Sequence, residues 1–279
     1  MSVRIIIDST TDLIPALRDR VKVIPLSIRF GEEEYIDGVT INTKEFYEKL
    51  VSGDVLPTTS QPTPAAFGEA YEEAVSAGDS VIVITIASKL SGTYQSATIA
   101  AEDYPGKVFV VDSRNVAIGA TILVQHALEL ADQGLSAEEI FERLLKIRSR
   151  IRIAVVVDTL EYLHKGGRIS KTVAIAGGLL SIKPVIIVEN GELKMVNKAR
   201  GNKQANAAMN KEIDKAGGVD FSMPVLLGYT GTTDELLRKY IAESAEYWGG
   251  RTFPSTIVGS TVGTHAGPNA VAVAFYVQE

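Results

Sequence analysis

The fold of this chain is most constrained by an alternation in its first half, where short runs of Val and Ile are separated by amphipathic helical stretches. Residues 81–86 are apolar at all but one position, which is typical of a strand covered on both faces in a parallel sheet. Further strand-like runs occur at 5–7, 22–26 and 108–111. Helix starts between the strands are indicated by the capping-box pairs Asn42 with Glu45 and Ser136 with Glu139. The alternation predicts a mostly parallel sheet with helices on both faces.

The pattern changes after residue 150. Residues 151–157 and 270–277 form strand-like runs, and Thr232 with Glu235 has the spacing of a helix cap. The dipeptide Asn190-Gly191 lies between two further runs and predicts a β-hairpin, so this half contains antiparallel pairs. We therefore expect an α/β protein of two domains. Residues 1–150 form an α/β/α sandwich and residues 151–279 form a mixed-sheet α/β domain.

Composition excludes several classes of function. The chain has 279 residues, a net charge of −6 and no Cys, so disulfides and thiolate chemistry are absent. Its acidic balance argues against nucleic acid as a partner. The three His residues have no metal-ligand spacing, and we expect neither a metal nor a cofactor. No run of 18 apolar residues is present, so we expect no membrane-spanning segment and a soluble, cytoplasmic protein.

Two polar segments in the first half follow predicted strands, where open α/β sheets place their ligands. Residues 8–12 combine Asp with Ser and Thr, although caps of the next helix or turn have the same composition. Residues 58–64 hold Thr59 and Ser60 in what we interpret as a stiff loop. The alternative for that loop is a simple entry to a helix that begins near Ala65.

The other two candidate segments carry the residues best suited to an anion. Ser91, Gly92 and Thr93 open a helix after the strand at 81–86, and free N–H groups beside hydroxyls suit a carboxylate or phosphate. Simple capping is the alternative, and the spacing matches neither a Walker loop nor a dinucleotide fingerprint. Residues 263–268 predict a loop in which His265 lies between glycines, with an incidental surface His as the alternative.

Taken in order, several motifs resemble those of the bacterial DegV family, whose better-understood members are the acyl-carrying subunits of fatty acid kinase. The resemblance covers essentially the whole chain. Its motifs are Asp8-Ser9-Thr10, Thr59-Ser60-Gln61-Pro62, Leu90-Ser91-Gly92-Thr93-Tyr94, Val111-Asp112-Ser113, the segment from Asp158 to Leu163, Gly166-Gly167-Arg168-Ile169, Lys183-Pro184 and the segment from Gly263 to Ala270. Residues 199–203 depart from the family pattern, because members often carry a more basic segment there.

The resemblance implies a long-chain fatty acid between the two domains, with its tail in an apolar tunnel. It implies that the carboxylate is held by Thr59 or Ser60, by Ser91 with Gly92 and Thr93, and by His265. A separate fatty acid kinase would contact Arg168 and Arg200 and convert the carboxylate to an acyl-phosphate for phospholipid synthesis. On this interpretation the chain is a carrier and not itself an enzyme.

Two other functions remain open from the sequence. A serine acyl-hydrolase would assemble Ser91 and His265 with Asp8 or Asp112, although the segment around Ser91 lacks the preceding Gly of a nucleophile elbow. A small-ketone binder is the other alternative, because the expected fold resembles the substrate-binding part of dihydroxyacetone kinases, where a His engages a ketone.

Overall fold

The structure is a computed structural model that describes residues 2–170 and 181–278. Its first sheet is parallel and has the strand order β2-β1-β6-β7. The strands are β1 (Val3–Asp8), β2 (Val21–Ile24), β6 (Ser80–Thr85) and β7 (Val108–Asp112). The connecting helices are η1 (Pro15–Arg20), α2 (Pro64–Ser76), α3 (Thr93–Ala101), α4 (Ala117–Asp132) and α5 (Ala137–Ile147).

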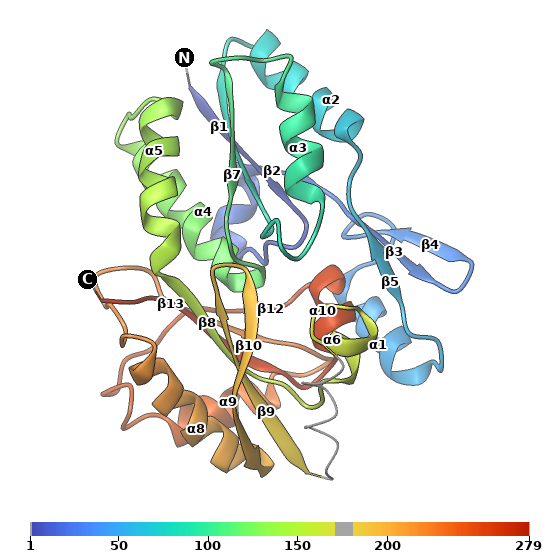
Figure 1. Ribbon diagram of the computed structural model, residues 1–279, viewed down its shortest axis with the longest axis vertical. Helices are drawn as coiled ribbons and strands as arrows, with labels where there is room; N and C mark the ends of the chain where they lie inside the picture. The colour runs from blue at the N-terminus through green and yellow to red at the C-terminus, as the bar shows by residue number, and fades with distance from the viewer. Residues whose placement is uncertain (1, 171–180, 279) are drawn as a thin grey trace.

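Helices cover both faces of this sheet (Figure 1). Alternate residues of a strand point to opposite faces, so Ile6 packs with α2 and α3 while Ile5 and Ile7 pack with α4 and α5. This arrangement requires apolar side chains at successive positions, as the sequence shows. The expected α/β/α layering is confirmed.

The second sheet has six strands in the mixed order β10-β9-β8-β13-β11-β12. Its strands are β8 (Ile151–Val156), β9 (Ile182–Glu189), β10 (Glu192–Arg200), β11 (Leu226–Tyr229), β12 (Ser255–Ile257) and β13 (Val271–Tyr276). The helices of this half are η2 (Arg148–Arg150), α6 (Glu161–Lys165), α8 (Gly201–Lys215), α9 (Glu235–Glu243) and α10 (Ser260–Ala266). One face of the sheet packs on α8 and α9, while Ile153 and Val188 on the other face join the core around α4.

A small antiparallel sheet in the order β4-β3-β5 was not predicted. It comprises β3 (Ser27–Phe30), β4 (Glu33–Ile36) and β5 (Thr58–Ser60). Helix α1 (Thr43–Ser52) lies between β4 and β5 in the chain. The prediction of a loop at Thr58–Ser60 was therefore wrong. These residues pair with β3, a contact across some 30 positions that no local pattern reveals.

A second loop prediction, for residues 263–268, was also wrong in part. Residues up to Ala266 belong to α10, so His265 lies in the last turn of a helix. A Cβ at Gly263 would lie 2.5 Å from Oη of Tyr47, so this glycine permits close packing of α10 on α1 and does not mark a loop. The packing outweighs the low helix propensity of Gly.

Most local start and turn signals were correct. Both capping boxes form, at Asn42 and at Ser136. The Asn190-Gly191 turn joins β9 to β10, with both residues at positive φ as a two-residue hairpin of type I′ requires. Thr232 does not cap α9, because the residue before that helix is Asp234 and its side chain makes no capping bond.

The proposed division near residue 150 stays a prediction. It coincides with η2, after which the chain enters the six-stranded sheet. In the described part of the chain, no helix is long and apolar enough to cross a membrane.

Candidate functional site

A largely apolar cavity lies between the carboxyl-end loops of the parallel sheet and one face of the six-stranded sheet. The space between its walls, with the open solvent at its mouth included, is about 930 Å³. Apolar side chains from five strands and α4 form much of its wall, among them Ile118, Ile153, Val155, Ile186, Val188, Leu193 and Ala272. The cavity therefore has the lining of a site for an elongated apolar ligand.

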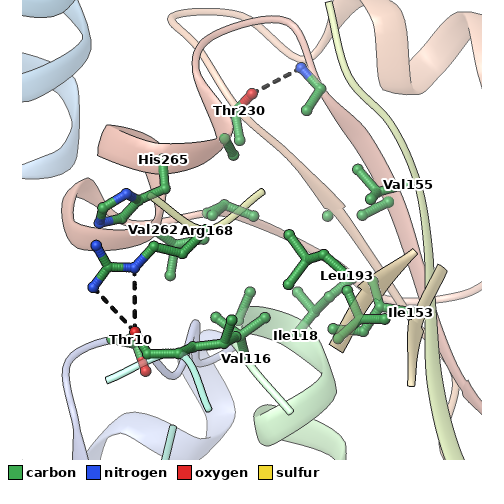
Figure 2. A pocket seen from close by; sticks show the side chains of 18 of the residues that line it. Thr10, Val116, Ile118, Ile153, Val155, Arg168, Leu193, Thr230, Val262 and His265 are labelled. Atoms are coloured by element: carbon green, nitrogen blue, oxygen red, sulfur yellow. Dashed lines mark hydrogen bonds between the residues drawn. The ribbon is translucent and has the colours of Figure 1, made fainter. Parts of the chain in front are cut away.

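Polar side chains gather at one part of the wall. Figure 2 shows His265 and Arg168 close together, with Ile153, Val155 and Leu193 away from them. Thr59 and Ser91 also line the cavity. The structure thus brings together four residues that the sequence analysis singled out, from β5, the loop after β6, the turn after α6, and α10.

The pair Thr59 and His265 is the central contact of this polar region. Thr59 Oγ1 lies 3.0 Å from His265 Nε2, and the two residues are 206 positions apart in the chain. Burial lowers the pKa of His265 to about 4, and the positive charge of Arg168 adds to this effect. The imidazole is consequently neutral near pH 7.

The other ring nitrogen of His265 has an unusual environment. Nδ1 is buried and has no hydrogen-bond partner among the described residues. A Cβ at Gly166 would lie 2.1 Å from that atom, so only Gly at this position leaves room for the ring. Gly166, the residue after α6, therefore fixes how closely α6 and α10 approach.

Arg168 lies in the cavity wall and is half-buried, not on an open surface turn as its expected role in partner contact suggested. Its Nε and Nη2 donate to the carbonyl of Leu90 at 3.2 and 3.0 Å, and its Nη1 donates to the carbonyl of Gly166. Burial lowers its pKa, but Arg remains charged at any ordinary pH. The guanidinium therefore joins the loop before Ser91 to the turn beside His265 and gives the cavity one positive charge.

Ser91 reaches the cavity, whereas Gly92 and Thr93, the two residues after it, do not line it. Ser91 Oγ lies 2.9 Å from Thr93 Oγ1 and accepts a longer bond from the Thr93 N–H at the start of α3. The α-carbon of Gly92 faces the Gln61 side chain, where a Cβ would lie 2.1 Å from Oε1. Gln61 in turn donates to the Gly92 carbonyl and to Ser96.

Two other predicted residues lie away from the cavity. Ser60 is exposed and does not line it, because neighbouring residues of a strand point to opposite sides. Arg200 is exposed at the end of β10. Of the two hydroxyls that the sequence left undecided, only Thr59 faces the cavity.

The sequence analysis gave no site role to several hydroxyl residues of the wall, among them Thr261 and also Thr10, although Thr10 lies in its candidate segment 8–12. Thr10 follows β1 and lines the cavity, and its Oγ1 donates to Asp8 at 2.5 Å. Its place at a strand end was the available signal. Thr261 on α10 also lines the cavity, and its hydroxyl donates to Asp37 across 224 positions. No local signal in the sequence points to that contact.

The side chains of a hydrolytic Ser-His-Asp relay are not connected. His265 contacts Thr59 and not Ser91, and its second nitrogen meets no carboxylate in the described part of the chain. Asp8 is buried, where desolvation raises its pKa, and its carboxylate accepts bonds from Thr10 and from the Ile86 N–H. Asp112 accepts from Ser88. The geometry therefore does not support the acyl-hydrolase alternative.

Metal ligands do not converge in the described ranges 2–170 and 181–278, where no group of three or more His, Asp and Glu side chains is placed to hold an ion. The site chemistry is accordingly that of hydroxyls, a neutral imidazole and one guanidinium.

Comparisons with known proteins agree on one family. The model of the DegV family matches residues 2–278. A DegV domain-containing protein of Caldanaerobacter subterraneus subsp. tengcongensis is 39% identical over 256 residues, which cover 91% of this chain and 90% of the relative.

Two solved structures share the fold over nearly their full lengths. A DegV family protein from Thermus thermophilus, described as fatty acid binding, is 31% identical with a TM-score of 0.88 and complete coverage of both chains. A stearic-acid-binding protein from Eubacterium ventriosum is 28% identical with a TM-score of 0.86, covering 99% of this chain and 98% of that one. Because the family model spans nearly every residue and the fold agrees throughout, this chain belongs to the DegV family.

Proposed function

We propose that this protein binds a long-chain fatty acid and presents its carboxylate to a separate kinase. The observation that carries the proposal is an apolar cavity with one polar region, formed by Thr59, Ser91, Arg168 and His265. The fatty-acid binding described for the Thermus thermophilus and Eubacterium ventriosum proteins supports the same ligand class.

The tail supplies the affinity. Burial of an acyl chain is worth roughly 0.8 kcal/mol per methylene, so a chain of about sixteen carbons has on the order of 10 kcal/mol available before the costs of association. The apolar wall from Ile118 to Ala272 receives the tail. Affinity therefore does not require strong contacts to the head group.

The head group is oriented by Thr59, and His265 sets the direction of that hydroxyl. A neutral imidazole carries one N–H. If that proton is on Nε2, the imidazole donates to Thr59 Oγ1 and leaves the Thr59 hydroxyl hydrogen for the carboxylate. The opposite tautomer would use up that hydrogen and bury an Nδ1–H that has no acceptor among the described residues. We assign the proton to Nε2 for these reasons.

Ser91 supplies the second donor, and Arg168 supplies charge. The nearby guanidinium compensates the carboxylate electrostatically, while three of its donor contacts go to the carbonyls of Leu90 and Gly166. A full bidentate clamp would hold both carboxylate oxygens and reduce their reactivity. The arrangement leaves an oxygen available for phosphoryl transfer from ATP, which the kinase must supply.

A small ketone is the other candidate ligand, and the lining argues against it. A ketone of a few carbons would leave most of the apolar wall from Ile118 to Ala272 without a partner. We therefore favour the fatty acid.

The kinase step is tested with delipidated protein, palmitate and ATP. We expect no acyl-phosphate from the protein alone, and product only after the cognate kinase is added. Arg200→Ala should slow that product formation while palmitate binding is unchanged, because Arg200 is exposed and outside the cavity. Arg168→Ala should reduce both the rate of product formation and the affinity for palmitate, because Arg168 lies in the cavity wall. Product formed without kinase would contradict the carrier role, and unaltered kinetics in Arg200→Ala would remove that residue from the partner surface.

A further inference from the structure

Helix α10 contacts the small antiparallel sheet at two points that are one helical turn apart. Near its start, the Thr261 hydroxyl donates to Asp37 Oδ2 at 2.6 Å and the Thr261 N–H donates to the same oxygen at 3.3 Å. Near its end, His265 contacts Thr59. Residues four apart lie on the same face of a helix, so both contacts are made by one face of α10.

The two sheet residues belong to strands that share a partner. Asp37 directly follows β4 and Thr59 lies in β5, and both strands pair with β3. The sheet therefore holds the two contact points at a fixed separation. A slide or rotation of α10 that breaks one contact strains the other.

Asp37 is suited to hold the start of α10. It is 7% exposed, and both hydrogen bonds to its carboxylate come from Thr261. A buried carboxylate is costly without such bonds, and the positive end of the helix dipole favours it here. Asp12 contributes a parallel contact, since its Oδ1 accepts from the Gly259 N–H at 2.6 Å.

The imidazole has one side-chain hydrogen bond to hold it among the described residues. Its Nε2 meets Thr59, its Nδ1 has no hydrogen-bond partner in the described residues, and Gly166 packs against the ring but offers it no hydrogen bond. The placement of the ring consequently depends on the placement of α10.

We propose that Asp37 is a positioning residue for His265: by fixing Thr261, it sets the register of α10 that brings the imidazole to Thr59. This inference rests on the proposed function, because its readout is the affinity for a fatty acid. Asp37 itself does not line the cavity, and its carboxylate contacts Thr261 and not the imidazole.

A double-mutant cycle tests the inference on delipidated protein with palmitate as the probe. His265→Ala should weaken binding by about 10-fold or more, because the Thr59 hydroxyl is then no longer directed at the carboxylate and its bond to that charged group is lost. Asp37→Ala should weaken binding by about 5-fold in the parent and by less than about 2-fold in the His265→Ala background, since coupled residues are not additive. Asp37→Asn, which keeps an acceptor for Thr261, should restore most of the loss and also serves if Asp37→Ala does not fold.

Asp220 offers a matched control. Its Oδ1 likewise accepts from the N–H and the hydroxyl of one residue, Ser222, at 3.0 and 2.6 Å, but it lies outside the cavity. Asp220→Ala should lower stability without changing palmitate affinity in either background. An equal loss from Asp37→Ala in both backgrounds, or no loss in the parent, would overturn the positioning role. A parent protein that binds no palmitate would instead overturn the proposed function, so the two failures are distinguishable.

Discussion

At the scale of single residues, Thr59 and Ser60 are adjacent in sequence but have different environments. Thr59 faces the cavity and His265, while Ser60 is exposed. Thr59→Ala should weaken palmitate binding by about 10-fold, because one hydrogen bond to a charged group is lost. Ser60→Ala is the matched control and should bind like the parent. The measurement is the dissociation constant of both variants, and an equal effect of the two substitutions would refute the assignment of Thr59.

The low pKa of His265, about 4, predicts how stability depends on pH. Below pH 6.5 the unfolded chain protonates this His while the folded protein does not, so its contribution to folding is present above pH 6.5 and is lost as the pH falls toward 4. For the ligand-free protein, the parent should lose on the order of 2 kcal/mol more than His265→Asn between pH 7 and 4.5. Urea unfolding of both proteins at several pH values measures this difference. Parallel pH profiles would show that the folded imidazole titrates normally.

At the scale of structural elements, the approach of α6 to α10 depends on Gly166. Its φ is ordinary, so a side chain here meets only the steric conflict with His265 Nδ1 at 2.1 Å. Gly166→Ala should cost about 1–3 kcal/mol or displace the imidazole, and weaken palmitate binding in either case. Gly68→Ala is the control, since that α2 residue has open space around its α-carbon. We expect Gly68→Ala to retain affinity, and thermal unfolding with palmitate titration compares the two. Wild-type affinity in Gly166→Ala would contradict this account of the α6–α10 contact.

The sequence predicted those elements whose signals are local. Capping boxes at Asn42 and Ser136, and the turn at Asn190-Gly191, rest on contacts within a few residues. In contrast, β5 forms because Thr59 pairs with Ile28, and α10 remains helical through Gly263 because it packs on Tyr47. Such contacts join distant segments and leave no periodic pattern.

The residues of the candidate site also divide into those that a local motif predicted and those that only long-range packing determines. Thr59, Ser91 and His265 were named from their motifs, and all three line one cavity. The position of Arg168 in the wall and the bond from Thr261 to Asp37 depend on how the two halves of the chain pack, so the sequence could not supply them.

At the scale of the whole molecule, the cavity draws its wall from both halves of the chain, so a bound acyl chain adds contacts that join them. A ligand that binds only the folded state stabilises it by roughly 2.7 kcal/mol at a concentration one hundred times its dissociation constant. We therefore expect the protein to purify together with its ligand, and we expect removal of the ligand to lower the unfolding temperature.

The most direct test of fatty-acid binding is mass spectrometry of the purified protein, first under native conditions and then after denaturation. We predict that about one long-chain fatty acid is bound per protein under native conditions and is released as the free acid on denaturation. Excess palmitate should replace it. Dihydroxyacetone at the same excess should displace nothing. A protein that carries no lipid and takes up none from palmitate, or one that exchanges its ligand for dihydroxyacetone, would contradict the proposed function.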